Sequence, residues 1–85
     1  MEYVVVAFRS RAETVKFSET LKRYGVYNEI VNTPKEAGVG CGLSVKISLA
    51  NVNATKRAVA VLGMKSFAGF FLVKLVAGSK IVKSI

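Results

Sequence analysis

Histidine and aspartate are both absent from this sequence of 85 residues, and cysteine occurs only once. The absence of histidine excludes Ser-His and Cys-His catalytic pairs. One cysteine without histidine or aspartate leaves no credible ligand set for zinc or iron, so we expect neither a metal site nor a cofactor. The single thiol, Cys41, also excludes a disulfide within the chain.

The sequence also shows neither a secretory signal nor a membrane-spanning stretch. The first four residues lack the positively charged segment and the cleavage site of a secretory signal. The longest apolar stretches, residues 3–8 and 67–73, are much shorter than a membrane span. We therefore expect a cytoplasmic protein with a reduced thiol and no contact with a membrane.

Acidic residues are scarce: thirteen lysines and arginines stand against five glutamates, which gives a net charge of +8. A charge of this sign attracts nucleic acid or acidic proteins. The basic residues are scattered and no run exceeds two, so the chain has no basic arm. Both a solvated basic surface and a docking surface for an acidic partner remain open.

The first part of the chain predicts a strand, a helix and a second strand. Residues 3–8 form a continuous β-branched and aromatic run, which is typical of a strand that is buried on both faces. Ser10 and Glu13 form a capping box at the start of the helix, and Gly25 ends it. Residues 26–31 are predicted as the second strand.

The second part of the chain predicts two more strands with a helix between them. Residues 43–49 alternate between apolar and polar side chains, which indicates a strand with one buried face. The helix begins at Asn51 or Asn53 and ends at Gly63. Residues 66–75 then supply a fourth strand that is apolar on both faces.

This element order, β-α-β-β-α-β, predicts an α+β fold. Right-handed crossovers give a ferredoxin-like sandwich: a four-stranded antiparallel sheet with the first and third strands at its centre and both helices on one face. Residues 1–75 make this single domain. Residues 76–85 are predicted as a C-terminal tail or an added edge strand, and packing on a neighbouring molecule is the other alternative.

The only glycine-rich segment, residues 34–42, connects the second and third strands and contains Cys41. Hairpin connections usually have about two to five residues, so the extra length suggests a functional loop. Glycines on both sides let backbone N–H groups turn toward the sulfur, where they would stabilise the thiolate. The alternative is an inert cysteine that acts as a small buried hydrophobe.

Three pieces of the sequence resemble the selenium/sulfur carrier protein-like family of small bacterial and archaeal domains. They are Val-Ala-Phe-Arg-Ser near the start, a helix that ends in Leu-Lys-x-x-Gly, and Thr-Pro-Lys-Glu followed closely by Cys-Gly-Leu-Ser-Val. The resemblance spans about residues 3–74. Where the family tends to have serines before the cysteine, this chain has Gly38-Val39-Gly40, so backbone N–H groups would have to replace hydroxyl donors.

The resemblance implies that Cys41 is a carrier thiol that holds sulfur or selenium as a persulfide or selenide for transfer between proteins. The donor would be a protein such as a cysteine desulfurase, and the acceptor is not identified. The chain would be a carrier and not an enzyme with turnover of its own. The supporting residues of the loop are Pro34, Lys35, Glu36, Gly38, Gly40 and Gly42.

A basic binding module with an inert cysteine is the alternative function. Lys46 and Lys74 would then contact phosphates, and Phe70 or Phe71 would stack on bases, although the strand motif of RNA-recognition domains is missing. A dimeric regulatory module that exchanges edge strands through residues 76–85 is a further reading. A homodimer is compatible with each of these functions, because an isolated domain of this size is only marginally stable.

Overall fold

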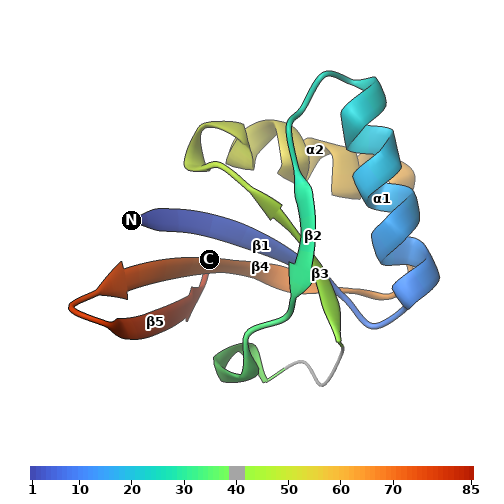
Figure 1. The fold of residues 1–85 in the computed structure, drawn as a ribbon. Helices are drawn as coiled ribbons and strands as arrows, with labels where there is room; N and C mark the ends of the chain where they lie inside the picture. Colours follow the sequence, from blue (N-terminus) through green and yellow to red (C-terminus); the bar gives the residue numbers. More distant parts are fainter. Residues whose placement is uncertain (39–41) are drawn as a thin grey trace.

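A computed structural model describes residues 1–38 and 42–85 and shows two helices packed on a sheet (Figure 1). The strands are β1 (Glu2–Phe8), β2 (Glu29–Asn32), β3 (Leu43–Ile47), β4 (Phe67–Val76) and β5 (Ser79–Ser84). The helices are α1 (Arg11–Arg23) and α2 (Val52–Leu62). Two short 3₁₀ helices, η1 (Lys35–Ala37) and η2 (Leu49–Asn51), follow β2 and β3.

The five described strands form one antiparallel sheet in the order β2-β3-β1-β4-β5. The α+β class is confirmed, and the first and third strands lie inside the sheet. The prediction of four strands is wrong, because residues 76–85 turn back and add β5 at the edge. Ala77 and Gly78 have φ of 49° and 81°, and Val76 pairs with Ser79 across this two-residue turn. Positive φ at both central positions matches the twist of a tight hairpin.

Both helices pack on the same face of the sheet, where they close the helix-side core. Its buried members are Val4, Val6, Phe8, Phe17, Leu21, Val45, Ile47 and Phe70. Val52 and Val59 of α2 pack against the same cluster. The ring centres of Phe8 and Phe17 lie 5.1 Å apart, a separation typical of favourable aromatic pairs. Burial of the apolar side chains in the helix-side core is therefore the main source of stability.

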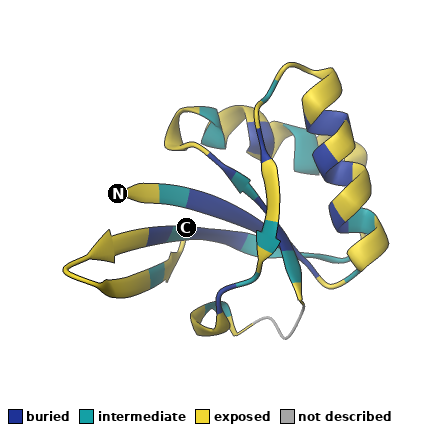
Figure 2. Ribbon diagram, in the orientation of Figure 1, coloured by how far each residue is buried: buried dark blue, intermediate teal, exposed yellow. Residues whose placement is uncertain are grey.

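The opposite face of the sheet carries a smaller group, the outer cluster. Its buried members are Val5, Ala7, Phe71 and Val73. Ala37 of η1 and Val82 of β5 pack against it. Since both faces of β1 are covered, residues 4–8 are completely buried, as the continuous apolar run predicts, and β1 is dark blue along most of its length in Figure 2.

The first helix begins at the predicted cap but uses Glu13 differently. The Ser10 hydroxyl oxygen accepts a hydrogen bond from the Glu13 N–H at 3.2 Å, and Gly25 has a left-handed φ of 78° after the helix. The Glu13 carboxylate does not return to the cap, as a capping box requires. It accepts hydrogen bonds from the Ser66 N–H, at 2.8 Å, and from the Ser66 hydroxyl. This contact joins the first turn of α1 to the residue before β4.

The second strand begins later than predicted because Asn28 is bound to α1. The Asn28 amide donates to the carbonyl oxygens of Ser18, at 3.2 Å, and Val26, at 3.0 Å. The Ser18 hydroxyl donates to Asn28 Oδ1 at 2.5 Å. These bonds satisfy the buried amide of Asn28, so the chain joins the sheet only at Glu29.

The third strand and the second helix also differ from prediction at one end each. β3 ends at Ile47, and the predicted inward residue Leu49 is 46% exposed in η2. Asn51 precedes α2, but its side chain donates to Ser48 Oγ at 3.2 Å instead of capping the helix. Among the described residues, no helix is long and apolar enough to span a membrane.

Candidate functional site

The two ends of the glycine-rich loop are held together at its base. The Thr33 N–H donates to the Gly42 carbonyl oxygen at 3.1 Å, and Thr33 Oγ1 lies 2.7 Å from Ser44 Oγ. Ser44 is fully buried, so its hydroxyl requires a protein partner in place of water. These contacts continue the β2–β3 pairing, which reaches Asn32 and Leu43. The loop therefore leaves and re-enters the sheet at one point.

The first half of the loop is a compact turn with local hydrogen bonds. The Ala37 N–H donates to the Pro34 carbonyl oxygen, and the Gly38 N–H donates to the Lys35 carbonyl oxygen, both at 3.1 Å. Gly38 has φ of 68°, a conformation that strains residues with a Cβ. Pro34 is buried, whereas Lys35 and Glu36 are exposed and form no ion pair with the residues that the structure describes. The turn thus presents one charge of each sign to solvent.

Five of the predicted site residues lie in the described part of the loop. Four of them, Pro34, Lys35, Glu36 and Gly38, form η1 and its two ends, and Gly42 closes the base of the loop. Gly40 and the predicted carrier thiol of Cys41 lie outside the described residues. The role of each of these residues stays a prediction, and the structure adds how the loop is anchored.

The sequence analysis missed the residues that support the loop from the sheet. Ala37 and Val82 pack against the same outer cluster, and η1 lies next to β5. Thr33 and Ser44 belong to the two pieces of the motif, but the sequence alone gives them no role. Ile81 and Val82 stand together between two lysines, so the sequence does not indicate which of the two is buried, and no local pattern connects Val82 with η1.

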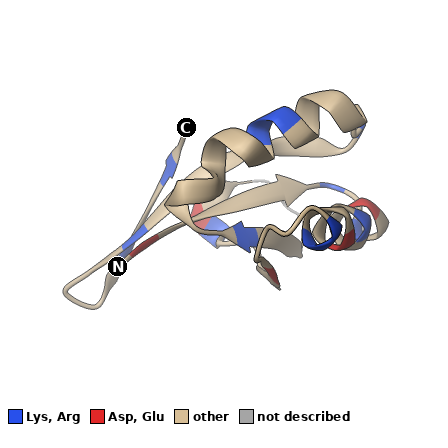
Figure 3. Cartoon of the chain, turned by 90° about the horizontal axis from the view of Figure 1, so that it is seen from above, with Lys and Arg blue, Asp and Glu red and all other residues tan. Residues whose placement is uncertain are grey.

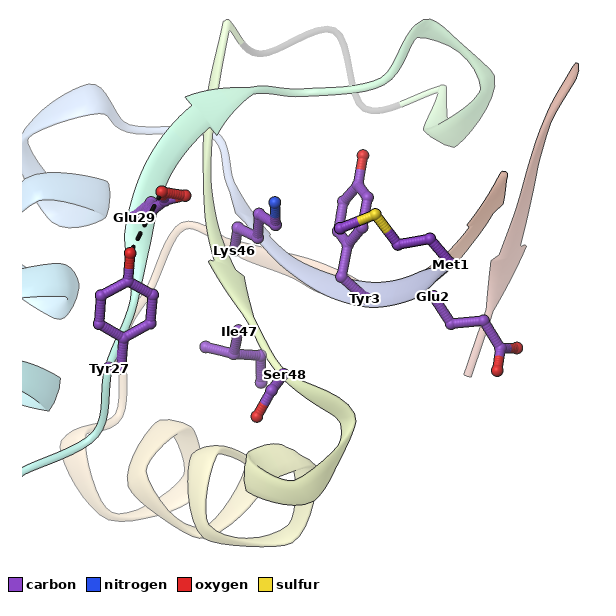
Figure 4. Close-up of a pocket in the computed structure, with 8 residues that line it drawn as sticks. All are labelled: Met1, Glu2, Tyr3, Tyr27, Glu29, Lys46, Ile47 and Ser48. Carbon is purple, nitrogen blue, oxygen red and sulfur yellow. Dashed lines mark hydrogen bonds between the residues drawn. The ribbon is translucent and has the colours of Figure 1, made fainter. Parts of the chain in front are cut away.

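A shallow pocket of about 200 Å³ lies elsewhere, at the β2-β3-β1 side of the sheet (Figure 4). It is lined by Met1, Glu2, Tyr3, Tyr27, Glu29, Lys46, Ile47 and Ser48. Lys46 Nζ lies 4.5 Å from the centre of the Tyr3 ring, a cation–π contact, and the Tyr27 hydroxyl donates to Glu29 at 3.4 Å. This arrangement can bind a small polar group, but it contains no thiol or imidazole for nucleophilic catalysis.

The exposed aromatic platform that the alternative nucleic-acid function would need is not formed. Phe70 is 6% exposed within the helix-side core, and Phe71 is 9% exposed within the outer cluster. Lys74 is 3.4 Å from a Glu2 carboxylate oxygen and so is partly neutralised. A base cannot stack on either phenylalanine, because both rings are buried within the protein.

Metal ligands do not gather in the part of the chain that the structure describes. Within residues 1–38 and 42–85, no three His, Cys, Asp or Glu side chains lie close enough to hold an ion. The polar groups that do come together there are the Thr33–Ser44 pair at the loop base and the lining of the pocket.

Comparison with known proteins gives one match. A family model described as "Putative Se/S carrier protein-like" matches residues 3–65, which include the whole of the glycine-rich loop and exclude β4 and β5. No curated protein and no solved structure matches the chain.

Proposed function

Because the chain belongs to the Se/S carrier protein-like family, we propose that it carries sulfur or selenium on Cys41. The observation that supports this function is that the family match contains every residue of the loop from Pro34 to Gly42. The anchoring of the loop adds physical support. A carrier must present its sulfur to two partners in turn, and a loop closed at its base by Thr33 and packed through Ala37 offers a defined platform.

The transfer chemistry needs only the thiolate of Cys41. This thiolate attacks the outer sulfur of a donor persulfide, R–S–SH, and forms a new sulfur–sulfur bond. The S–S bond of the donor breaks, the donor leaves as the thiolate R–S⁻, and Cys41 holds the atom as Cys41–S–SH. An acceptor thiolate then repeats the same exchange and releases Cys41. For selenium the bond that breaks in the donor is S–Se, and no oxidant or cofactor is consumed.

The described loop residues have separate roles in this proposal. Gly38 and Gly42 add no side chain to the loop. Because the Gly38 N–H is bonded to the Lys35 carbonyl oxygen, the Gly42 N–H is the candidate dipole among the described residues of the loop. The exposed Lys35 ammonium supplies positive charge that favours the thiolate. Pro34 is buried and Glu36 is exposed, so Pro34 serves to fix the turn and Glu36 to set the charge that a partner meets.

The wider setting of the proposal is a cytoplasmic transfer protein without turnover of its own. Its donor is a protein such as a cysteine desulfurase, and its acceptor is a second protein thiol. We also propose that the fold is ferredoxin-like with β5 added at one edge. The described order of the first four strands, β2-β3-β1-β4, with a helix after β1 and another after β3, supports this classification.

Intact-mass measurement tests the proposal directly. The protein is incubated with a cysteine desulfurase and cysteine, and separately with selenocysteine, and the Cys41→Ser variant is the matched control. The expected result is a gain of one sulfur or selenium atom that is lost on reduction and absent from Cys41→Ser. No adduct, together with a Cys41 that resists alkylation in the folded protein, would overturn the carrier function.

A further inference from the structure

Net positive charge is concentrated in the second part of the chain, because the acidic residues all lie in the first part. Residues 37–85 contain seven of the thirteen basic residues and none of the five glutamates. In Figure 3, α2 and the β4–β5 hairpin carry lysine or arginine, and the acidic colour is confined to β1, α1, β2 and their surroundings. A cationic surface without interspersed acids attracts an anionic partner and repels another cation.

The hairpin forms a groove with an apolar floor and a basic rim, the hairpin groove. It is lined by Leu72, Lys74, Ile81 and Lys83 and has a volume of about 200 Å³. The strand register places all four side chains on the helix side of the sheet. Leu72 pairs with Val4 of the helix-side core and with Lys83, and Lys74 pairs with Ile81. Directly paired residues of antiparallel strands share a face.

The groove is open because the sheet is wider than its helix layer. The two helices cover the face over the inner strands, whereas the hairpin extends away from them in Figure 1. Ile81 is 52% exposed and Val76, on the same face, is also 52% exposed. An aliphatic surface of this kind on a strand pair, next to a helix, has the shape that a further helix would cover.

We propose that the hairpin groove binds an acidic amphipathic helix of a partner protein. The aliphatic floor suits the apolar face of such a helix, and Lys74 and Lys83 suit glutamates at its margins. Lys56 of α2 adds a third cation on the helix side, since its Nζ lies 5.6 Å from the centre of the Phe70 ring. Glu2 forms an ion pair with Lys74 at 3.4 Å, and Lys83 forms none with the described residues.

Two other occupants fit the groove less well. A second copy of this chain would bring one basic rim against another, and the Glu2 carboxylate that lies there is already paired with Lys74 of its own chain. Single-stranded nucleic acid binds by stacking its bases on exposed aromatic rings. The groove is lined by two aliphatic residues and two lysines and by no aromatic ring, and Phe70 on the same face of β4 is buried.

The hairpin groove lies on the helix side of β5, the strand that contacts η1 of the glycine-rich loop. Val82 points to the outer cluster with Ala37, whereas Ile81 and Lys83 point to the opposite face. A helix in the groove therefore docks at the same edge strand that contacts η1. If the carrier function holds, on which this identification of the partner rests, the helix belongs to the sulfur or selenium donor or acceptor.

Fluorescence anisotropy with a labelled peptide tests the binding. The probe is a short peptide with leucines at helical spacing and glutamates between them. Lys83→Glu and Ile81→Thr should each weaken binding about fivefold, a loss of about 1 kcal/mol. Threonine retains strand propensity, so Ile81→Thr removes apolar contact without breaking β5.

Lys80→Glu is the matched control, because Lys80 lies on the same strand but on the opposite face. It makes the same change in net charge and should alter binding less than twofold, by the same conversion of affinity to energy. Equal losses for Lys80→Glu and Lys83→Glu would overturn the proposal, since they would mean diffuse attraction. Tighter binding of an oligouridine probe that depends on Lys83 would also overturn it, in favour of nucleic acid.

A transfer assay separates this inference from the carrier function. Loading of Lys83→Glu from a low-molecular-weight polysulfide should equal that of the unchanged protein, while loading from a protein donor or delivery to a protein acceptor should fall. If no loading occurs from any source but the peptide still binds at the groove, the carrier function fails and the docking surface stands. If loading occurs but neither the peptide nor protein transfer depends on Lys83, the docking surface fails alone.

Discussion

The two faces of the sheet are closed by different kinds of structure. On one face two helices cover a core in which phenylalanine rings are adjacent, with Phe67 and Phe70 5.4 Å apart. On the other face the short turn η1 and the edge strand β5 cover four buried side chains. Global stability therefore depends mainly on the helix side, whereas the outer side supports the loop that precedes Cys41.

The largest effect should come from removing one phenylalanine from each face. Phe70→Ala should cost about 4 kcal/mol and Phe71→Ala about 3 kcal/mol, because Phe70 contacts a second ring in the larger cluster. Urea unfolding of the two variants measures both values. A greater loss for Phe71→Ala would reverse the ranking of the two faces.

Phe70→Ala and Phe71→Ala should also differ in how fast trypsin cleaves the chain near the glycine-rich loop. Phe71→Ala weakens the cluster that Ala37 packs on, so trypsin should cleave after the exposed Lys35 faster than global unfolding allows. Phe70→Ala should show only the increase that follows from its loss of global stability. Equal local cleavage in both variants would mean that the outer cluster does not hold η1.

A smaller effect should follow from the buried amide on the helix side. Asn28→Ala should cost about 2 kcal/mol because the buried Ser18 hydroxyl loses its acceptor and the link between α1 and β2 is broken. Thermal or urea unfolding measures this loss. Asn53→Ala, in the exposed first turn of α2, is the control and should change stability little. If Asn28→Ala left the free energy of unfolding nearly unchanged, the helix side would not depend on these hydrogen bonds.

The loop base should respond asymmetrically to its two hydroxyls. Thr33→Val should cost about 2 kcal/mol because it leaves the buried Ser44 hydroxyl without a partner, whereas Ser44→Ala should cost about 1 kcal/mol. The half-buried Thr33 can turn its hydroxyl to water. Urea unfolding of both single variants and the double variant gives the coupling, and simple additivity would contradict an interaction between the two groups.

The smallest effect concerns pH and the contact between α1 and β4. Hydrogen bonds from the Ser66 hydroxyl and N–H hold the pKa of Glu13 below its usual value of 4.5. The ionised carboxylate therefore stabilises the fold above pH 4.5, and this contribution is lost as the pH falls through the lower pKa of the folded state. As the pH falls below 4.5, the melting temperature of the unchanged protein should fall more steeply than that of Glu13→Gln. Parallel curves of melting temperature against pH would contradict the stabilising role of the ionised Glu13.

The sequence was sufficient for the centre of the sheet. The continuous apolar run of residues 3–8 predicts a strand buried on both faces, and Gly25 and Gly63 predict the ends of the helices. These features are local, since each depends on the spacing of neighbouring side chains or on one positive φ. The first four strands and both helices were recovered for this reason.

Contacts between residues far apart in the sequence cannot be predicted from such local patterns. Lys80 and Lys83 make residues 79–84 look like a solvated tail, and Ala77 is an unusual residue for a positive φ, so the sequence does not decide between a tail and an edge strand. For the candidate site, the Thr-Pro-Lys-Glu and Cys-Gly-Leu motif identified the loop, but no spacing rule relates Ala37 to Val82. Their common packing becomes visible only when β4 brings β5 to the outer face.

The central position of β1 sets when this chain can acquire its structure during synthesis. Val4 pairs with Ile47 on one side and with Leu72 on the other, so the first strand to leave the ribosome waits for partners made much later. Pairings between residues so distant in sequence are slow to form, because the intervening chain must be ordered first. Until β4 emerges, the most apolar strand of the protein has an exposed edge, and that interval is when a nascent chain of this kind most needs protection from aggregation.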